Sequence, residues 1–224
     1  LSTPPTETCL STQLEVRVVI FSLDTRGLQV LLRPLADQQP AVWELPGQAV
    51  GMDQSLDESA SHCLTHYSGL QESYLEQLYT YGDVNRCNEN RVVSVVYFAL
   101  IPLDKAIFKS PDSARWHPVE ALPPLIFDTT DILSYALRRL RYKLEYSAVG
   151  FELLPDNFSL SELQSTYEKI LGEKLDKRNF RKRILKADVI EPTPHQRLGE
   201  GRPARLYRYR PDAVAEVKTR RLFP

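Results

Sequence analysis

The charged side chains of this 224-residue chain are divided unevenly between its two parts. Residues 158–224 carry 16 Lys and Arg against 9 Asp and Glu, a net charge of +7, whereas residues 1–157 carry 12 against 20, a net charge of −8. A domain usually contains about 100–150 residues, so this length predicts one full domain and a smaller second one. A compact basic segment is typical of a surface that contacts phosphate backbones, although a salt-bridged face or a dimer contact would carry the same charge.

The remaining composition is that of an ordinary globular protein, with 42% hydrophobic and 25% charged residues. No apolar stretch approaches the roughly 20 residues that span a bilayer, and the first residues lack the pattern of a secretory signal. The 3 cysteines, Cys9, Cys63 and Cys87, are odd in number and have no paired spacing, which argues against a disulfide framework. We therefore expect a soluble, cytoplasmic protein with free thiols and no membrane contact.

The acidic part alternates between strand and helix patterns. Stretches rich in β-branched residues predict strands at 14–23, 28–33, 75–81, 91–101 and 114–119. Between them, Ser55–Ser68 has apolar residues at helical spacing, a serine cap and a terminating Gly69. A second apolar stripe predicts a helix from about Thr130 to Tyr146. This part of the chain is therefore expected to be an α+β domain with a mixed sheet.

The basic part has helical patterns with one strongly cationic helix. Ser161 and Gln164 have capping-box spacing, and the apolar stripe that follows them ends at Gly172. Asp176 can cap a second helix over Lys177–Ala187, which contains no acid. Its polar face carries Lys177, Arg178, Arg181, Lys182 and Lys186. Because a solvated helix face usually mixes the two signs, these cations indicate an external polyanion.

A loop over 193–203 and a strand over 204–210 follow this helix pair, an order that predicts a C-terminal winged helix-turn-helix domain. In such a domain the second helix enters the major groove of double-stranded DNA, and the wing, here 195–205, reaches the backbone or the minor groove. Candidate contacts to base edges are Arg178, Asn179 and Lys182. Candidate contacts to phosphates are Lys177, Arg181, Arg202 and Arg205.

The segment from Leu45-Pro-Gly47 to Gly69-Leu70 resembles the Nudix box, a loop-helix-loop that reads G-x5-E-x7-R-E-U-x-E-E-x-G-U in that family. The glutamates of the family hold magnesium against a diphosphate, because hard divalent cations take oxygen ligands. In this register the first glycine, the glutamates and the arginine are replaced by Gln48, Gln54, His62, Cys63, His66 and Tyr67. The resemblance implies a Nudix-like domain, an α/β/α sandwich with a mixed sheet. With these replacements we expect the domain not to hydrolyse its ligand. Asp53, Asp57 and Glu58 lie out of register with the metal positions.

His62, Cys63 and His66 also permit a zinc site, because histidines at i and i+4 share a helix face. Adjacent helical residues point about 100° apart, and no second ligand cluster accompanies the three. A surface histidine pair on a packed helix is the preferred interpretation, and we predict no metal.

A Nudix-like scaffold without catalysis can still bind a nucleoside diphosphate, provided that it supplies cations. Arg33, Arg86 and Arg91 lie close to the ends of predicted strands, and guanidinium groups suit phosphate oxygens. Each of them could equally be a solvated loop residue. Glu44, just before the box, and Asp128 complete the candidate ligand-binding set.

Both modules together resemble the Nudix-related transcriptional regulators known as NrtR. The similar stretches are Tyr81-Gly-Asp83, Arg91-Val-Val-Ser-Val95, Trp116-His-Pro118, Leu175-Asp-Lys-Arg-Asn-Phe-Arg181 and Gly201-Arg-Pro-Ala-Arg-Leu-Tyr207. The resemblance implies a bacterial homodimeric repressor of NAD biosynthesis or salvage genes. Its Nudix-like domain senses ADP-ribose as effector, with no cofactor, and its winged helices release a palindromic operator when ADP-ribose binds.

The family's Phe-Asp-His reads Phe127-Asp-Thr129 here, and other branches of the group sense sugars. A sugar-responsive regulator, a Nudix ADP-ribose pyrophosphatase with an accessory basic domain, and an adaptor that binds an acidic protein are the alternatives. The expected organisation is an N-terminal arm (1–13), a ligand-sensing domain (14–146), a linker (147–157) and a DNA-binding domain (158–224).

Overall fold

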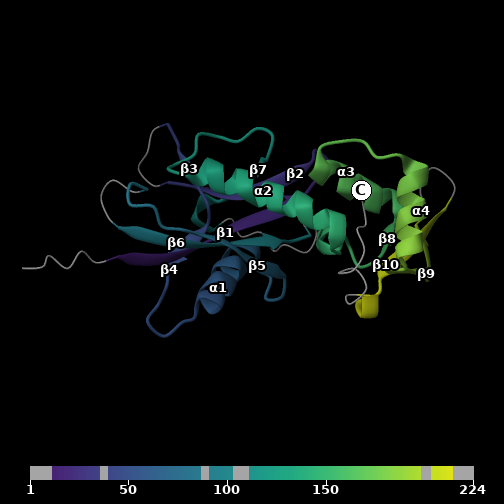
Figure 1. Ribbon diagram of the computed structural model, residues 1–224, viewed down its shortest axis with the longest axis horizontal. Coiled ribbons are helices and arrows are strands. Elements are labelled where there is room, and N and C mark those ends of the chain that lie inside the picture. The colour runs from purple at the N-terminus through teal and green to yellow at the C-terminus, as the bar shows by residue number, and fades with distance from the viewer. Residues whose placement is uncertain (1–11, 36–39, 87–90, 103–110, 198–202, 214–224) are drawn as a thin grey trace, which may run out of the picture.

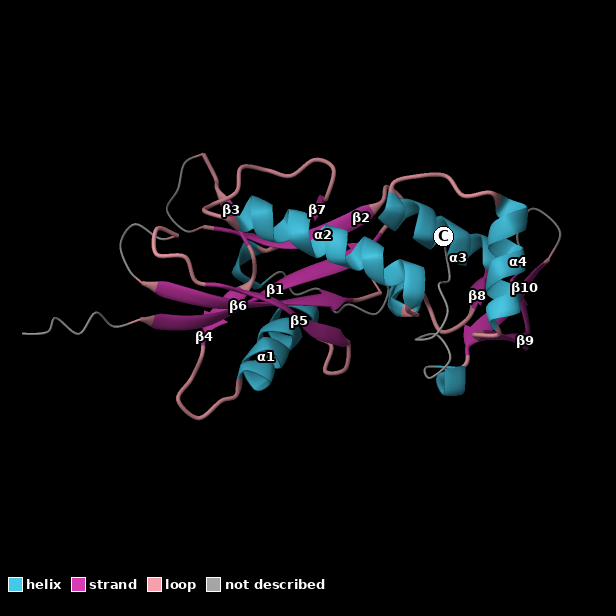
Figure 2. Ribbon diagram, viewed as in Figure 1, coloured by secondary structure: helices cyan, strands magenta, loops and turns pink. Residues whose placement is uncertain are grey.

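The computed structural model describes residues 12–35, 40–86, 91–102, 111–197 and 203–213 (Figure 1). A mixed sheet lies between the helices α1 (Leu56–Ser68) and α2 (Thr129–Tyr146), and a smaller helical unit with its own sheet follows α2 (Figure 2). The predicted α/β/α sandwich followed by a winged helix-turn-helix is confirmed. The predicted arm, 1–13, lies almost wholly outside the described residues.

Among the described residues, the strands of the large sheet are β1 (Gln13–Leu23), β2 (Leu28–Pro34), β3 (Trp43–Glu44), β4 (Gly47–Ala49), β5 (Tyr74–Tyr81), β6 (Val92–Leu100) and β7 (Arg115–Pro118). The main order is β3-β2-β1-β6-β5, with β4 paired to β1 and β7 paired to β2. β1 and β6 run parallel, whereas β1 and β2 run antiparallel, so the sheet is mixed as predicted. β1 is therefore a central strand, and its side chains reach both layers.

The side chains of β1 alternate between the two faces of the sheet and contribute to the apolar core on each face. Val16, Val18 and Ile20 are fully buried in the cluster that contains the inner face of α1. Val19 and Phe21 are fully buried in the cluster that contains the inner face of α2. Because neighbouring side chains of a strand point to opposite faces, one apolar run serves both layers.

The ends of α1 follow from local hydrogen bonds. Ser55 accepts a bond from the Glu58 backbone N–H, and the Glu58 carboxylate accepts from the Ser55 N–H, which forms a capping box. Gly69 ends the helix at φ 73°, a left-handed conformation that glycine adopts without steric cost. The predicted bounds of α1 are thus confirmed.

The stretch 147–157, which the sequence predicted as a linker, packs against both domains. Its 3-10 helix η2 (Val149–Leu153) buries Val149 and Phe151 in the same cluster as Leu144 of α2 and Tyr167 of the next helix. A 3-10 helix of this length is too short to show a repeating pattern of apolar residues. Its packing could therefore not be predicted from the sequence. The two domains therefore share a continuous apolar core.

The second unit contains α3 (Leu160–Leu171), α4 (Lys177–Ala187), η3 (Pro211–Ala213) and a sheet in the order β8 (Phe158–Ser159), β10 (Ala204–Tyr209) and β9 (Ile190–Arg197). The capping box predicted at Ser161 and Gln164 is wrong, because Ser159 and Glu162 form it two residues earlier. Ser159 has the extended backbone that a cap needs, since it pairs with β10. The cap of α4 is Asp176, as predicted.

The predicted loop over 193–203 is also partly wrong, because β9 continues to Arg197. Pro192 and Pro194 suggested a loop, but β9 lies at the edge of its sheet, where a missing N–H is tolerated. The tip of the wing, 198–202, lies outside the described residues.

Cys63 is a buried free thiol, and Cys9 and Cys87 lie outside the described residues. In the part of the chain that the structure describes, no helix combines the length and the apolar character needed to cross a bilayer.

Candidate functional site

Charged side chains from three strands meet at one end of the large sheet. Glu44 of β3 accepts from Arg17 Nη1 at 3.0 Å and pairs with Arg33 Nη2 at 2.7 Å, although only 5% of its side chain is exposed. Arg17 Nε also donates to Glu15 at 2.6 Å. Burial opposes the charge of Arg17, but the carboxylates of Glu15 and Glu44 outweigh it and raise the pKa of Arg17. A buried carboxylate thus joins two guanidinium groups.

A second ion pair joins the β5–β6 loop to α2. Arg86 donates from Nε and Nη2 to the two carboxylate oxygens of Asp128, at 2.5 and 3.1 Å. Only 7% of the Arg86 side chain is exposed, and its Nη1 donates to Ser94 Oγ at 2.5 Å. Ser94 Oγ in turn donates to Glu15. This hydroxyl links the Arg86–Asp128 pair to the cluster around Glu44.

We call these residues the effector network, made of Glu15, Arg17, Arg33, Glu44, Arg86, Ser94 and Asp128. Each of its carboxylates is bound by at least one arginine in a partly buried setting. Guanidinium groups bind carboxylates and phosphates with the same paired geometry. In this structure the guanidinium groups of Arg17, Arg33 and Arg86 are already paired with carboxylates.

The structure brings together four of the predicted ligand-binding residues: Arg33, Glu44, Arg86 and Asp128. Arg91 is not part of the network, because its Nη1 donates to the backbone oxygen of Asp83 at 3.0 Å. Sequence reasoning missed Glu15, Arg17 and Ser94. Glu15 and Arg17 had a signal in the sequence, because both interrupt the start of the otherwise apolar β1.

The side chains at the predicted Nudix-box positions make local contacts. Gln54 lies 3.2 Å from His62, and burial raises the pKa of the Cys63 thiol to about 12. The Tyr67 hydroxyl donates to Asp112 at 2.7 Å. Within the described ranges, no three His, Cys, Asp or Glu side chains are grouped so that they could hold a metal ion.

Two of the out-of-register carboxylates have other bonds. Glu58 completes the capping box of α1 with Ser55. Asp57 accepts a bond from the Tyr97 hydroxyl at 2.5 Å. Both carboxylates therefore have a structural role, Glu58 in capping α1 and Asp57 in joining α1 to β6.

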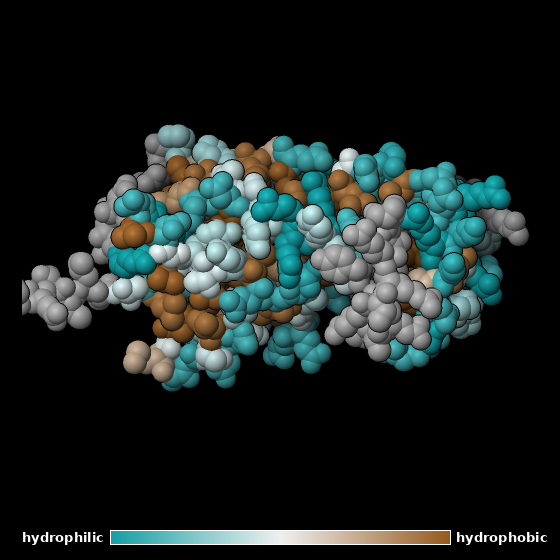
Figure 3. Space-filling view, viewed as in Figure 1, coloured by the Kyte–Doolittle hydropathy of each residue, from teal (hydrophilic) through white to brown (hydrophobic). Residues whose placement is uncertain are grey.

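The cationic helix α4 presents its charges to solvent. Phe180 and Ile184 are buried, which directs the opposite face of the helix outward. The exposed side chains include Lys177, Arg178, Asn179, Lys182 and Lys186. Figure 3 shows hydrophilic residues over the end of the molecule that holds α4.

The cations of this domain differ in their partners. Arg197 pairs with Glu162, Arg208 pairs with Glu191, and Arg210 pairs with Asp188 at 2.5 Å. By contrast, within the described part of the chain, none of the predicted DNA contacts in this domain forms an ion pair, namely Lys177, Arg178, Arg181, Lys182 and Arg205.

Two of these predicted contacts also have local bonds. Arg181 Nη2 donates to Ser161 Oγ at 3.1 Å, and the Asn179 backbone N–H donates to the Asp176 cap at 2.8 Å. Arg205 is exposed on β10, and Arg202 lies outside the described residues. The predicted DNA contacts that the structure describes therefore lie on α4 and on the adjacent strand.

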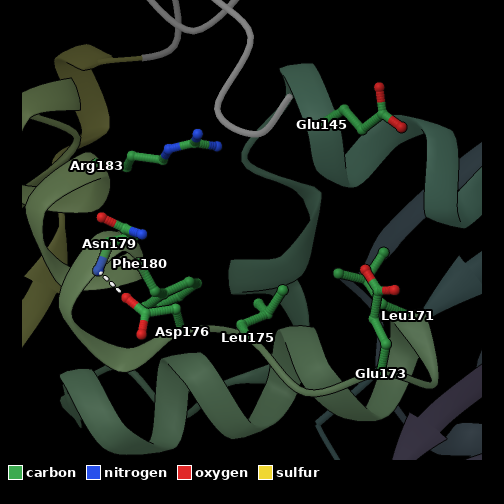
Figure 4. Close-up of a pocket in the computed structure, with 8 residues that line it drawn as sticks. All are labelled: Glu145, Leu171, Glu173, Leu175, Asp176, Asn179, Phe180 and Arg183. Atoms are coloured by element: carbon green, nitrogen blue, oxygen red, sulfur yellow. Dashed lines mark hydrogen bonds between the residues drawn. The ribbon is translucent and has the colours of Figure 1, made fainter.

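One flank of α4 faces α2 across a cleft of about 220 Å³. Asn179 and Arg183 of α4 extend into this cleft, and Glu145 of α2 lies on its opposite side (Figure 4). The apolar lining comes from Leu171, Leu175 and Phe180. The C-terminal end of α2 therefore borders the helix that carries the exposed side chains of Lys177, Arg178 and Lys182.

Comparison with known proteins places this arrangement in a family. Residues 150–209 match the NrtR DNA-binding winged helix domain. The ADPR responsive transcriptional repressor NtrR of Acinetobacter baylyi is 37% identical over 201 residues, which cover 87% of this chain and 80% of the relative.

Two of the similar solved structures come from Shewanella oneidensis. The crystal structure of Shewanella oneidensis NrtR complexed with a 27mer DNA has 31% sequence identity and a TM-score of 0.83, covering 93% of this chain and 98% of that one. The NUDIX domain of Shewanella oneidensis NrtR complexed with ADP ribose has 27% identity and a TM-score of 0.50, covering 58% of this chain and 89% of that one. With its Nudix-like sandwich, its winged helix and these relatives, this chain belongs to the NrtR family of Nudix-related transcriptional regulators.

Proposed function

We propose that this protein is a transcriptional repressor that binds operator DNA through its winged helix and releases it when ADP-ribose binds the Nudix-like domain. The proposal rests on a difference among the cations of the winged helix. Arg197, Arg208 and Arg210 are paired with carboxylates, whereas the cations of α4 that are predicted to contact DNA form no ion pair within the described residues. The relative from Acinetobacter baylyi is named as an ADPR-responsive repressor, and the Shewanella oneidensis homologue was solved with DNA and, as its NUDIX domain, with ADP ribose.

The DNA-binding surface is assigned to α4 and the wing. Arg178, Asn179 and Lys182 contact base edges, because their side chains are exposed on α4. The phosphate contacts are Lys177, Arg181, Arg202 and Arg205. An exposed helix face of cations without acid partners gains most from a polyanion, because binding releases the counterions of the DNA.

The effector site is assigned to the effector network. Arg33 and Arg86 bind the diphosphate of ADP-ribose, and in its absence they pair with Glu44 and Asp128. Arg91 is assigned as a further contact to the diphosphate. Isothermal titration of the protein with ADP-ribose, and with pentose sugars as the competing effector class, distinguishes this assignment from a sugar sensor.

We assign no hydrolysis to the Nudix-like domain. The glutamate positions of the box hold Gln54, Cys63, His66 and Tyr67, and none of these side chains supplies the anionic carboxylate oxygens that magnesium favours. Incubation with ADP-ribose and magnesium should therefore yield no AMP. Sustained release of AMP and ribose phosphate would instead establish a pyrophosphatase with an accessory basic domain.

The operator-bound form is assigned as a homodimer. Two winged helices related by a two-fold axis contact half-sites at a fixed spacing, so a small change in their separation weakens both contacts together. The genes under control are those of NAD biosynthesis or salvage, which the sensing of ADP-ribose would connect to NAD turnover.

The deciding experiment is selection of bound sequences from a random duplex pool, with and without ADP-ribose. We expect enrichment of a palindromic sequence and its loss when ADP-ribose is present. Binding that is salt-sensitive but equal for all sequences would contradict a specific operator. Failure to bind any duplex at low ionic strength would overturn the proposal as a whole and favour an adaptor for an acidic protein.

A further inference from the structure

Asp128 occupies the N-cap position of α2 but does not cap it. The equivalent residues Ser55, Ser159 and Asp176 accept a bond from a backbone N–H in the first turn of α1, α3 and α4. Asp128 makes no such bond, and both of its carboxylate oxygens are bound by Arg86. Its backbone, at φ −85° and ψ 13°, also lacks the extended conformation of the other caps. The first turn of α2 therefore lacks a bond that the carboxylate of Asp128 is chemically able to supply.

The segment before α2 is tied to the effector network. Trp43 donates its backbone N–H to Pro124 at 2.9 Å, and the Ile126 N–H donates to the Trp43 carbonyl at 3.0 Å. Trp43 directly precedes Glu44, which binds Arg17 and Arg33. Phe127 has a φ of 50°, which is uncommon for a residue other than glycine. The network is thus connected to the start of α2 in two ways: through the Arg86–Asp128 pair, and through the backbone bonds of Trp43 to the segment before α2.

The other end of α2 is bound to the winged helix. α2 has 18 residues, a length of about 27 Å at 1.5 Å per residue. Arg141 Nε donates to the Ile170 carbonyl of α3 at 2.9 Å, and Leu144 is fully buried in the shared core. Glu145 lines the cleft that Arg183 of α4 enters (Figure 4). A displacement at the start of α2 would reach α3 through these contacts, and α4 through the packing of Tyr167 of α3 against Phe180 of α4.

We propose that Asp128 is a switch with two alternative partners, Arg86 in the effector-free protein and the first turn of α2 when an anionic diphosphate holds Arg86. This inference rests on the proposed function, because it describes how the effector site is coupled to the DNA-binding helix. The exchange rotates the segment at Phe127 and Asp128, and α2 carries the displacement to α4.

Electrostatics sets the direction of this exchange. A diphosphate offers more acceptor oxygens and more negative charge than one carboxylate, so it competes effectively for the guanidinium group of Arg86. The released carboxylate of Asp128 then lies beside an anion, which repels it. The N-terminus of a helix attracts a carboxylate through its unpaired N–H groups and its dipole. Both effects move Asp128 from Arg86 to α2.

The test compares Asp128→Asn with Asp131→Asn in the full-length protein. Asp131 is an acid of the same first turn, and it is exposed and has no ion pair within the described residues. Isothermal titration gives the affinity for ADP-ribose with and without operator duplex. In the unsubstituted protein we expect the operator to weaken ADP-ribose binding by about tenfold.

Asp128→Asn should remove the carboxylate that competes with ADP-ribose for Arg86. It should therefore also abolish the coupling between the effector site and α2. Without operator, the variant should bind ADP-ribose about threefold more tightly or better, and the effect of the operator should fall below about twofold. Asp131→Asn should leave the ADP-ribose affinity and the effect of the operator on it the same as in the unsubstituted protein. If Asp128→Asn keeps the original affinity and the original operator effect, the switch is disproved.

Hydrogen exchange of the unsubstituted protein provides an independent measurement if the variant does not fold. ADP-ribose should slow exchange of the backbone N–H groups of Thr130 and Asp131, because Asp128 caps that turn in the bound state. Unchanged or faster exchange at these positions overturns the switch. Absence of any operator effect on ADP-ribose binding in the unsubstituted protein would instead contradict the proposed function itself.

Discussion

Arg141 of α2 donates from Nε to the backbone carbonyl of Ile170, near the C-terminal end of α3, at 2.9 Å. The last carbonyl groups of a helix have no partner within the helix, so this side chain from one domain satisfies a group of the other. The bond joins the last helix of the Nudix-like sandwich to the first helix of the winged helix. The relative placement of the two domains therefore depends on a specific hydrogen bond as well as on apolar packing.

Gly150 is required for close packing at the same junction. A Cβ atom on Gly150 would lie 2.9 Å from both Leu144 Cδ2 and Tyr167 Cε2, and both of these side chains are fully buried. Gly150→Ala should therefore destabilise the protein by about 1–3 kcal/mol, which urea unfolding would measure. Gly82→Ala is the control, because its Cβ would lie no closer than 3.7 Å to a neighbour. Equal stability of the two variants would contradict this packing.

The salt dependence of DNA binding should be determined by the free cations of α4. Replacing Arg178 and Lys182 by alanine should make the slope of log K against log salt shallower by about 0.9 for each phosphate that is no longer neutralised. Fluorescence anisotropy of a labelled duplex at several salt concentrations measures this slope. Arg208→Ala removes a cation that is paired with Glu191, so its slope should stay that of the unsubstituted protein. A double variant with an unchanged slope would exclude α4 as the contact surface.

Glu76 should contribute stability that disappears in acid. Burial opposes its charge, but bonds from Lys143 and Tyr74 and the nearby Arg139 outweigh burial and lower the pKa of Glu76. Because this folded-state pKa is depressed, the contribution is present above the unfolded value of about 4.3 and is lost as the pH falls through the folded value.

Glu76→Gln should therefore cost about 1 kcal/mol at pH 7, an amount reduced by partial exposure to solvent. The difference from the unsubstituted protein should shrink progressively below about pH 4. Urea unfolding of both proteins at pH 7 and pH 3 measures the two differences. A difference that is independent of pH would show that the charge of Glu76 is not responsible.

The Cys63 thiol should be chemically inert in the folded protein. Burial raises its pKa to about 12, and only 2% of the residue is exposed, so little thiolate is present and reagents have no access. In a Cys9→Ser, Cys87→Ser background, iodoacetamide at pH 8 should label Cys63 only after urea is added. Rapid labelling of the folded protein would show that α1 opens locally.

The bounds of α1 and α4 could be predicted from the sequence because they depend on neighbouring residues. Ser55 and Gly69 for α1, and Asp176 for α4, act on backbone groups within a few positions of themselves. The same local logic failed for α3, where Ser161 also has a suitable side chain. Pairing of Phe158 and Ser159 with β10, a contact between distant parts of the chain, selected Ser159 instead.

The sequence by itself determined the two-domain character and the cationic face of α4, because charge distribution and helical periodicity are properties of the linear chain. It also indicated Arg33, Glu44, Arg86 and Asp128 as candidate binding residues, but not which of them pair with one another. Arg17 and Glu44 are 27 positions apart and Arg86 and Asp128 are 42 apart, so strand order and the docking of α2 decided these contacts. Only the tertiary structure therefore distinguished the cations that are already neutralised from those that remain available for an external anion.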